Sequence, residues 1–263
     1  MILKDGFLCS SYSQIDLYER CPYQWWLKYV QQSQSNIASK HLGYGLAIHE
    51  TLELFFKMHC NGELPPYDVM VSMYYHFLNV HSIPYDSYEE EMEWTMEGLL
   101  MLERLYNPKN ELEKLMTTAK IIGVEKSFVV PLHGVNIIGF IDLVLKTYDG
   151  IIVVDHKSGK KMFDKSKLND NLQFPIYAMA IKNEYGELPV KNYYNFTKVH
   201  NLQEASVTEQ KIKEAELRIS KIFKKMSKKK HTPKPCALCY WCDFSKYKMN
   251  ICTYSSDWKP KSA

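Results

Sequence analysis

Hydrophobic positions along the chain change their spacing twice, and the two spacings predict helices on either side of a strand-rich middle. The helical spacing, with apolar residues three and four positions apart, favours core-facing helices. It covers residues 42–60, the span 61–115, residues 167–185 and residues from about 207 to 226. Ser11 to Val30 is also predicted helical, with an interruption at Pro22, because proline cannot continue a preceding helix.

The middle of the chain has the short apolar runs and glycine-containing turns that are typical of strands. The predicted strands are 121–124, 128–132, 135–146 and 151–155, with one more at 190–197. This order of helices, a β-meander of three or four strands, a helix, a strand and a final helix predicts an α/β fold with a mixed central sheet flanked by helices. Residues 61–115 show no chemical motif, so we interpret them as a helical insertion that covers the site.

Composition limits the possible classes of protein. A chain of 263 residues with 46% hydrophobic residues buries a full core, so we expect a single domain over residues 1–263. The N-terminus has no basic region before a long apolar core, and no window reaches the roughly 18 uncharged apolar residues of a membrane helix. We therefore expect a cytoplasmic protein without a membrane partner. The net charge of +3 neither requires nor opposes a nucleic-acid partner.

Charged residues occur inside the most apolar strand pair, which predicts chemistry there. Asp142, Asp155 and Lys157 lie on two apolar runs joined by the turn signal Tyr148-Asp149-Gly150. Buried charge is costly without a partner, and a divalent cation shared by the two carboxylates would offset that cost. Lys157 projects from the same strand face as Asp155, while the His156 side chain points to the other face. We interpret this strand pair, with its three charged residues, as a metal-dependent nuclease site.

Simpler interpretations exist for each residue. Asp142 alone fits a strand-end aspartate, and Asp155 with Lys157 fits a surface ion pair. His49 and Glu53 fall on one helical face, which predicts a polar or metal-facing pair. The string His49-Glu50-x-x-Glu53 lacks the second histidine of a zinc-protease helix, so we exclude a protease.

Four motifs together resemble the RecB/AddB-type nucleases of the P-D-(D/E)-x-K superfamily. They are Gly45-x-x-x-His49, Gly139-Phe140-Ile141-Asp142, Asp155-His156-Lys157 and Gln173-x-x-x-Tyr177. The resemblance implies a restriction-endonuclease-like core and Mg²⁺ or Mn²⁺ held by His49, Asp142, Asp155 and the backbone carbonyl of His156. It also implies that Gln173 and Tyr177 help to position the lysine or the nucleic acid. Without the other motifs, Tyr177 would be interpreted as a packed core residue.

The cysteines form a second constellation near the C-terminus. Cys239, Cys242 and Cys252 resemble the C-terminal element of the iron–sulfur members of this family, and Cys21 resembles their N-terminal ligand. The resemblance implies a 4Fe-4S cluster that joins residues 11–30 to residues 232–255. A local structural Zn²⁺ site is the alternative, with Cys236 in place of Cys21. Cys9 and Cys60 are interpreted as packed thiols.

Lysines and aromatic residues near these cysteines leave two further interpretations open. The run from Lys221 to Lys234 is basic, and it fits either a solvated helix face or contacts with phosphate. The aromatic residues either pack around the cluster or stack on unpaired bases. They are Tyr23, Trp25, Trp26, Tyr240 and Trp241.

Taken together, these features predict a metal-dependent deoxyribonuclease that acts on single-stranded DNA or single-stranded ends. The resemblance to CRISPR-associated RecB-like exonucleases and related phage nucleases implies exonuclease activity, possible endonuclease activity, and a role in recombination, repair or phage DNA processing. It also implies a helicase, a recombinase or an integrase as a partner. The alternatives are a non-catalytic DNA-binding or recombination subunit with the same fold, and a zinc-stabilised RNA-processing nuclease.

Overall fold

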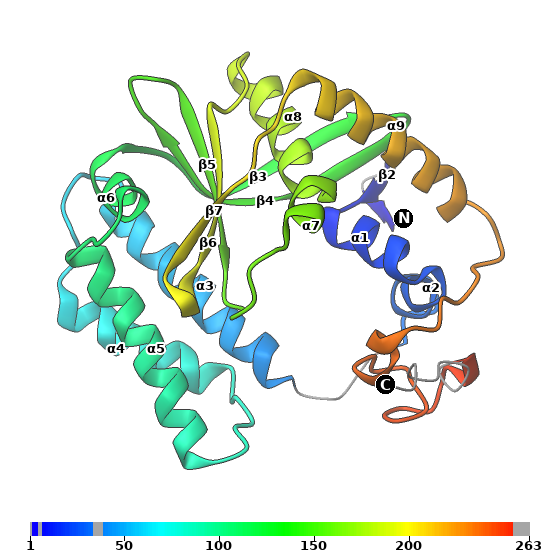
Figure 1. Ribbon diagram of the computed structural model, residues 1–263, viewed down its shortest axis with the longest axis horizontal. Coiled ribbons are helices and arrows are strands. Elements are labelled where there is room, and N and C mark those ends of the chain that lie inside the picture. Colours follow the sequence, from blue (N-terminus) through cyan, green and yellow to red (C-terminus); the bar gives the residue numbers. More distant parts are fainter. Residues whose placement is uncertain (1, 5–6, 34–38, 255–263) are drawn as a thin grey trace. The chain divides into compact units, whose positions relative to one another are not determined.

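The computed structural model describes residues 2–4, 7–33 and 39–254 (Figure 1). The chain forms two compact units. The first unit comprises Met1–Ile37, Val129–Gly139 and Glu209–Ala263, and the second comprises Ala38–Phe128 and Phe140–Thr208. Both contain strands and helices, so the predicted α/β class is confirmed.

Two short N-terminal strands and three helices make up most of the described first unit. Strand β1 (Ile2–Lys4) pairs antiparallel with β2 (Phe7–Ser10), and β2 pairs parallel with the start of β4 (Val135–Lys146). The helices are α1 (Tyr12–Arg20), α2 (Pro22–Tyr29) and α9 (Glu209–Met226), and a 3-10 helix, η2, spans Ala237–Tyr240.

The helix ends of the first unit follow from residues that the sequence makes visible. The Ser11 hydroxyl accepts a hydrogen bond from the Gln14 backbone N–H at 3.3 Å, which caps the start of α1. Pro22 then begins α2, because a proline at the first helical position sacrifices no hydrogen bond. The guanidinium of Arg218 makes two hydrogen bonds to the Glu19 carboxylate, at 2.7 and 2.8 Å, and so ties α9 to α1.

Four helices open the second unit. They are α3 (Lys40–His59), α4 (Tyr67–Val80), α5 (Tyr88–Tyr106) and α6 (Glu111–Thr118). Side chains of Ser39, Ser87 and Asn110 cap α3, α5 and α6, respectively. The span predicted to be a helical insertion is therefore helical.

A mixed sheet follows these helices. In the second unit β4 pairs antiparallel with β5 (Ile151–Lys157), β5 pairs parallel with β6 (Lys191–Phe196), and β6 pairs antiparallel with β7 (Asn201–Glu204). Strand β3 (Lys120–Leu132) pairs with β4, and both strands run from one unit into the other. Between β5 and β6 lie α7 (Lys165–Asp170) and α8 (Gln173–Tyr185), and η1 (Thr197–Val199) follows β6.

The structure revises several predicted boundaries. The two strands predicted at 121–124 and 128–132 are one strand, and the helix predicted at 167–185 is divided at Asn171 and Leu172. The turn between β4 and β5 matches its prediction: the Thr147 N–H donates to the Gly150 carbonyl at 2.9 Å, and Gly150 has φ 140°. The single-domain organisation and the covering role of the insertion stay predictions.

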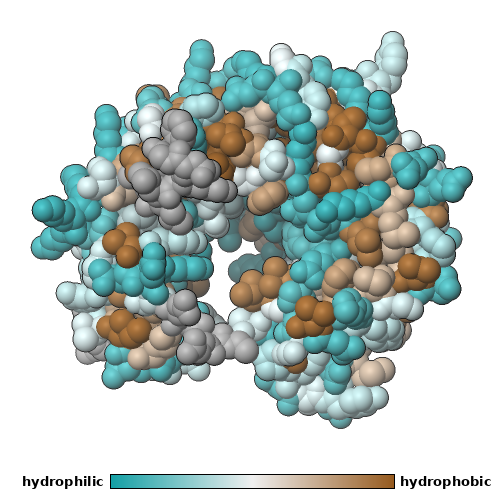
Figure 2. All heavy atoms as spheres, turned by 180° about the vertical axis from the view of Figure 1, so that it is seen from behind, coloured by the Kyte–Doolittle hydropathy of each residue, from teal (hydrophilic) through white to brown (hydrophobic). Residues whose placement is uncertain are grey.

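On the face seen in Figure 2, hydrophobic residues form separate patches among hydrophilic ones. None of the described helices is long and apolar enough to cross a membrane. Inside the second unit the Tyr44 and Tyr74 hydroxyls both donate to the Trp94 carbonyl, at 3.0 and 3.2 Å, so the buried phenols are satisfied. These bonds join α3 and α4 to α5.

Gly98 on α5 allows this close packing, and its replacement tests the arrangement. A Cβ at this position would collide with the ring and hydroxyl of Tyr74. Gly98→Ala should therefore lower the free energy of unfolding by about 1–3 kcal/mol, the usual cost of overpacking a core. Thermal or urea unfolding measures the change. Gly159→Ala is the matched control, since no atom lies within 4 Å of a Cβ at that position; equal losses in both variants would contradict the packing argument.

Candidate active site

Adjacent antiparallel strands β4 and β5 carry the three charged residues of the predicted site. Asp155 is buried, and three side chains contact its carboxylate. The Lys157 ammonium lies 2.6 Å from Oδ2, the Gln173 Nε2 donates to Oδ1 at 2.6 Å, and the Tyr177 hydroxyl donates to Oδ1 at 3.2 Å. The negative charge of Asp155 is therefore compensated by one cation and two hydrogen-bond donors.

Gln173, at the start of α8, connects the members of this network. Its Oε1 accepts from the Lys157 ammonium at 3.1 Å, while its Nε2 also lies 2.9 Å from the Tyr177 hydroxyl. The Asn171 side chain accepts a hydrogen bond from the Gln173 backbone N–H at 2.7 Å and thereby fixes the first turn of the helix. The spacing of four residues puts Gln173 and Tyr177 on one helical face, as the sequence indicated.

The protonation states suit this arrangement. Burial raises the pKa of Tyr177, and the charge of Asp155 raises it further, so the phenol stays a hydrogen-bond donor. The Lys157 side chain is partly exposed, and its ammonium lies 5.3 Å from the centre of the Tyr194 ring. Lys157 thus contacts Asp155 while remaining accessible to a substrate.

A second group of polar side chains lies in the same unit. His49 of α3, Glu125 of β3 and Asp142 of β4 have ligand atoms that all lie within 4.8 Å of one another. The His49 Nδ1 is 3.6 Å from the Asp142 Oδ2, which also accepts a hydrogen bond from the His156 backbone N–H at 2.7 Å. Two carboxylates and one imidazole form a donor set that fits Mg²⁺ or Mn²⁺.

The electrostatics of this group are consistent with a bound cation. Burial raises the pKa of Asp142, and the neighbouring charge of Asp155 raises it further. Burial also raises the pKa of Glu125. Burial lowers the pKa of His49, so the imidazole is neutral and able to donate a lone pair. Clustered carboxylates repel one another, and a divalent cation removes that repulsion.

Sequence reasoning missed Glu125. It lies inside a strand of mostly apolar and basic residues, in Val124-Glu125-Lys126, and this isolated acid was the available signal. Its backbone has φ 44°, a left-handed conformation that costs a residue other than glycine about 1–3 kcal/mol. Such backbone conformations concentrate at functional sites. Here the residue with the left-handed backbone is the one that completes the group with His49 and Asp142.

Not every predicted metal ligand lies in this group. Asp155 is outside it because its carboxylate is held by Lys157, Gln173 and Tyr177. Glu53, which lies one helical turn after His49 on α3, forms an ion pair with Lys57 and is not in the group.

The His156 side chain is part of the packing rather than of the metal group. It is buried, its ring stacks on Phe56 with centres 5.8 Å apart, and its Nδ1 lies 3.1 Å from the Asn195 side-chain nitrogen. Burial lowers the His156 pKa to about 3, so the ring is neutral. The proposed coordination by its backbone carbonyl stays a prediction.

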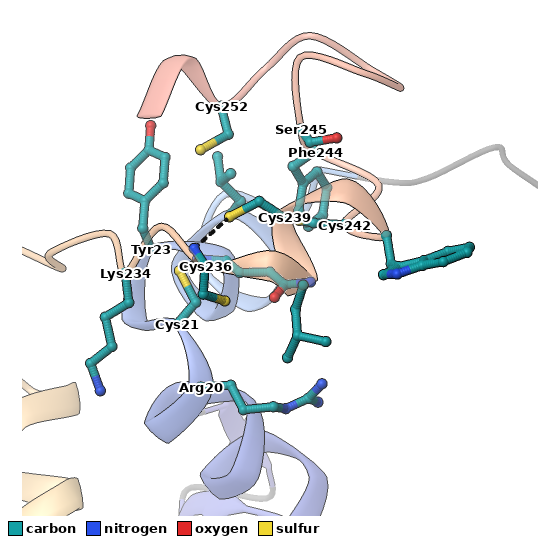
Figure 3. Close-up of a pocket in the computed structure, with 14 residues that line it drawn as sticks. Arg20, Cys21, Tyr23, Lys234, Cys236, Cys239, Cys242, Phe244, Ser245 and Cys252 are labelled. Carbon is teal, nitrogen blue, oxygen red and sulfur yellow. Dashed lines mark hydrogen bonds between the residues drawn. The ribbon is translucent and has the colours of Figure 1, made fainter. Parts of the chain in front are cut away.

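Five cysteines line one pocket of the first unit (Figure 3). They are Cys21, between α1 and α2, and the C-terminal Cys236, Cys239, Cys242 and Cys252. The Cys252 backbone N–H donates to the Phe244 carbonyl at 2.6 Å, which holds the last of these cysteines near the others. Segments from the two ends of the sequence thus supply thiols to a single pocket.

The thiols differ in their surroundings. Burial, together with the neighbouring Cys252, Cys21 and Cys239, raises the pKa of Cys242 to about 11. Cys236 instead lies beside Cys239, whose sulfur accepts a hydrogen bond from the Cys236 backbone N–H at 3.3 Å, the dashed line in Figure 3. Among the described residues no three cysteine sulfurs lie within 4.8 Å of one another. Thiols as soft ligands fit either iron–sulfur or zinc, and their ligand roles stay predictions.

The two remaining cysteines differ from each other. Cys9 is buried in β2, which confirms its prediction as a packed thiol. Cys60 is exposed at the C-terminal end of α3, so the same prediction was wrong there. Cys60 is exposed because it lies at a helix end that solvent reaches, whereas Cys9 lies in a strand.

Comparison with known proteins gives one positive result. No curated protein matches the sequence. The sequence does match the family model described as the PD-(D/E)XK nuclease superfamily, over residues 10–247. This range includes both polar groups of the second unit and most of the cysteine pocket. The family implies nuclease activity with divalent metal ions and DNA as the substrate. The match covers most of the sequence, and the chain belongs to the PD-(D/E)XK nuclease superfamily.

Proposed function

We propose that this protein is a Mg²⁺- or Mn²⁺-dependent deoxyribonuclease whose active site lies in the second unit. One observation carries the proposal: Lys157, held by buried Asp155 on β5, lies on the strand next to β4, whose Asp142 forms a group with Glu125 and His49. His49, Glu125 and Asp142 would hold the metal ion, and Asp155, which lies outside this group, would hold Lys157. The bound ion would neutralise charge on the scissile phosphate and lower the pKa of a bound water.

The protein side chains would then stabilise charge and hold the reacting groups in position. Asp155 holds the Lys157 ammonium in place, so that it can orient the attacking water or stabilise the extra negative charge on the phosphate. Gln173 and Tyr177 are positioning residues, because they fix the Asp155 carboxylate and, through Gln173, the lysine. A network of this kind reduces the reorganisation that the reaction would otherwise require.

Within this function we further propose single-stranded DNA or single-stranded ends as the substrate and exonucleolytic cleavage. This narrower proposal is supported by the motif resemblance to RecB/AddB-type and CRISPR-associated nucleases. The pocket lined by five cysteines supports a 4Fe-4S cluster bound by Cys21, Cys239, Cys242 and Cys252, because both ends of the sequence supply soft thiol ligands to it. A helicase, a recombinase or an integrase would be a suitable partner.

Removal of either member of the central ion pair should abolish cleavage. Asp155→Ala and Lys157→Ala should each lower the rate of DNA hydrolysis more than about 100-fold. Either change removes the Lys157 ammonium, or its anchor, from the negative charge that develops on the phosphate in the transition state. Degradation of labelled DNA with Mg²⁺ or Mn²⁺ measures the rate, and circular dichroism checks the fold. Lys120→Ala changes an exposed strand lysine and should leave the rate unchanged. Full activity in both active-site variants would refute the mechanism.

Glu125 provides a test that does not depend on activity. Saturating Mn²⁺ should raise the Tm of the wild-type protein, because an ion that binds only the folded state stabilises it, by about 2.7 kcal/mol at 100 times Kd. Glu125→Gln should lose most of this increase, since it removes one charged ligand. Calorimetry or dye-monitored melting measures both. Glu184→Gln, which removes a surface partner of Lys126, should keep the full increase. A retained increase in Glu125→Gln would exclude Glu125 as a ligand.

The cysteine variants distinguish the two metal sites. If the pocket holds an iron–sulfur cluster, anaerobically purified protein should be brown, and Cys21→Ser should lose colour and iron. Cys236→Ser should keep both, because Cys236 is beside the predicted ligand set rather than in it. Elemental analysis with visible absorbance reads out the result. Colourless protein with zinc that is lost in Cys236→Ser but kept in Cys21→Ser would establish the zinc site instead.

A further inference from the structure

Three large aromatic side chains are exposed beside the cysteine pocket. Trp241 is 70% exposed, Tyr240 57% and Tyr247 50%. The ring centre of Tyr240 lies 5.1 Å from that of Trp241 and 5.8 Å from that of Tyr247, so the three rings form one cluster. Aromatic side chains contribute most to stability when they are buried. A cluster left open to solvent therefore indicates a binding surface.

The backbone that carries these rings is well held. The Trp241 N–H donates to the Leu238 carbonyl at 3.1 Å, and the Lys248 ammonium binds the Trp241 carbonyl at 3.1 Å. The same ammonium forms an ion pair with Asp243 at 2.9 Å. Buried Phe244 anchors the following residues. The rings are thus presented by an ordered loop, which reduces the entropy that binding would cost.

Positive charge is concentrated in the same part of the sequence. Residues 221–254 contain nine lysines and one acidic residue, Asp243, a net charge of +8, whereas the whole chain carries only +3. The six lysines between 221 and 230 are all exposed, and in the described part of the chain none of them forms an ion pair. Lys246 lies 5.0 Å from the centre of the Tyr247 ring, so one cation is adjacent to the cluster itself.

We propose that Tyr240, Trp241 and Tyr247 form a stacking platform for the unpaired bases of single-stranded DNA, with lysines of residues 221–254 contacting the phosphates. Exposed rings combined with positive charge are the two components that bind single strands with little sequence preference. The platform belongs to the first unit and uses none of the catalytic residues. This inference deepens the proposed function, because it supplies a physical basis for the choice of a single-stranded substrate.

Charge and ring exposure together favour a single strand over other ligands. In a duplex the base faces are stacked on one another, so phosphate contacts would remain but the rings would contribute little. An anionic membrane surface also attracts lysine and tryptophan, and it serves as the competing outcome. The family match to DNA-cleaving enzymes favours the nucleic acid.

The test measures binding without cleavage. Full-length Asp155→Asn protein is titrated into fluorescein-labelled oligothymidylate, into a duplex of the same length and into vesicles containing anionic lipid. We expect tighter binding of the single strand, accompanied by quenching of tryptophan fluorescence. Trp241→Ala in this background should weaken single-strand binding at least about fivefold, the lower end for loss of one base–aromatic stack. Duplex binding should change less than twofold.

Matched variants separate stacking from charge and from misfolding. Trp241→Phe should retain most of the affinity, and Tyr148→Ala, which removes an exposed tyrosine of the second unit, should have no effect. Replacement of Lys228, Lys229 and Lys230 by glutamine should reduce the salt dependence, by a slope of roughly 0.7 for each phosphate that the protein no longer neutralises. Trp241→Ala should leave that slope unchanged. Unchanged circular dichroism and an unchanged Tm verify that each variant is folded.

The possible failures are distinct. Unchanged single-strand affinity in Trp241→Ala, equal losses for single strand and duplex, or tight binding only to vesicles would each overturn the platform. Cleavage by the wild-type protein in such a case would leave the nuclease function intact. Conversely, ring-dependent binding by a wild-type protein that cleaves no DNA would support the platform and contradict the proposed function.

Discussion

Burial of the Asp155 carboxylate is the constraint on which the rest of the candidate site depends. An isolated buried charge is too costly to keep, so the fold must provide partners from several elements. Strand β5 provides Lys157 and helix α8 provides Gln173 and Tyr177. The same interactions that make the charge tolerable also immobilise the lysine. Stability and chemical positioning are therefore achieved by one set of contacts.

The second polar group has a different energetic character. Around Asp155 the charges are balanced, whereas His49, Glu125 and Asp142 bring together two carboxylates and a neutral imidazole, with no lysine or arginine among the three. Burial, and after it the charges of nearby carboxylates, raise the pKa values of Asp142 and Glu125. The site thus has two parts. The network around Asp155 is preorganised, and the group of His49, Glu125 and Asp142 gains stability from a cation. This division of roles agrees with metal-dependent hydrolysis in the superfamily to which the chain belongs.

The sequence predicted those features that depend on local patterns. Two apolar runs and the Tyr148-Asp149-Gly150 turn specify the β4–β5 hairpin, and the spacing of Gln173 and Tyr177 specifies a shared helical face. The sequence did not predict that Glu125 belongs to the site. Its position there depends on a positive φ and on the pairing of β3 with β4, and the local spacing of residues predicts neither. The short strands β1, β2 and β7 escaped for a related reason. Each has only three or four residues, and its stability comes from pairing, β1 with β2, β2 with β4 and β7 with β6, rather than from its own composition.

The cysteine pocket has a consequence for the order of biosynthesis. Cys21 and Cys252 are 231 positions apart, so the ribosome makes the first thiol long before the last. At typical synthesis rates the interval is roughly 10 to 50 seconds, during which the early helices have no C-terminal partner. Any metal centre that uses both ends can only be inserted after nearly all of the described chain has emerged. Maturation of this pocket would therefore be a late event, controlled by metal supply rather than by the start of folding.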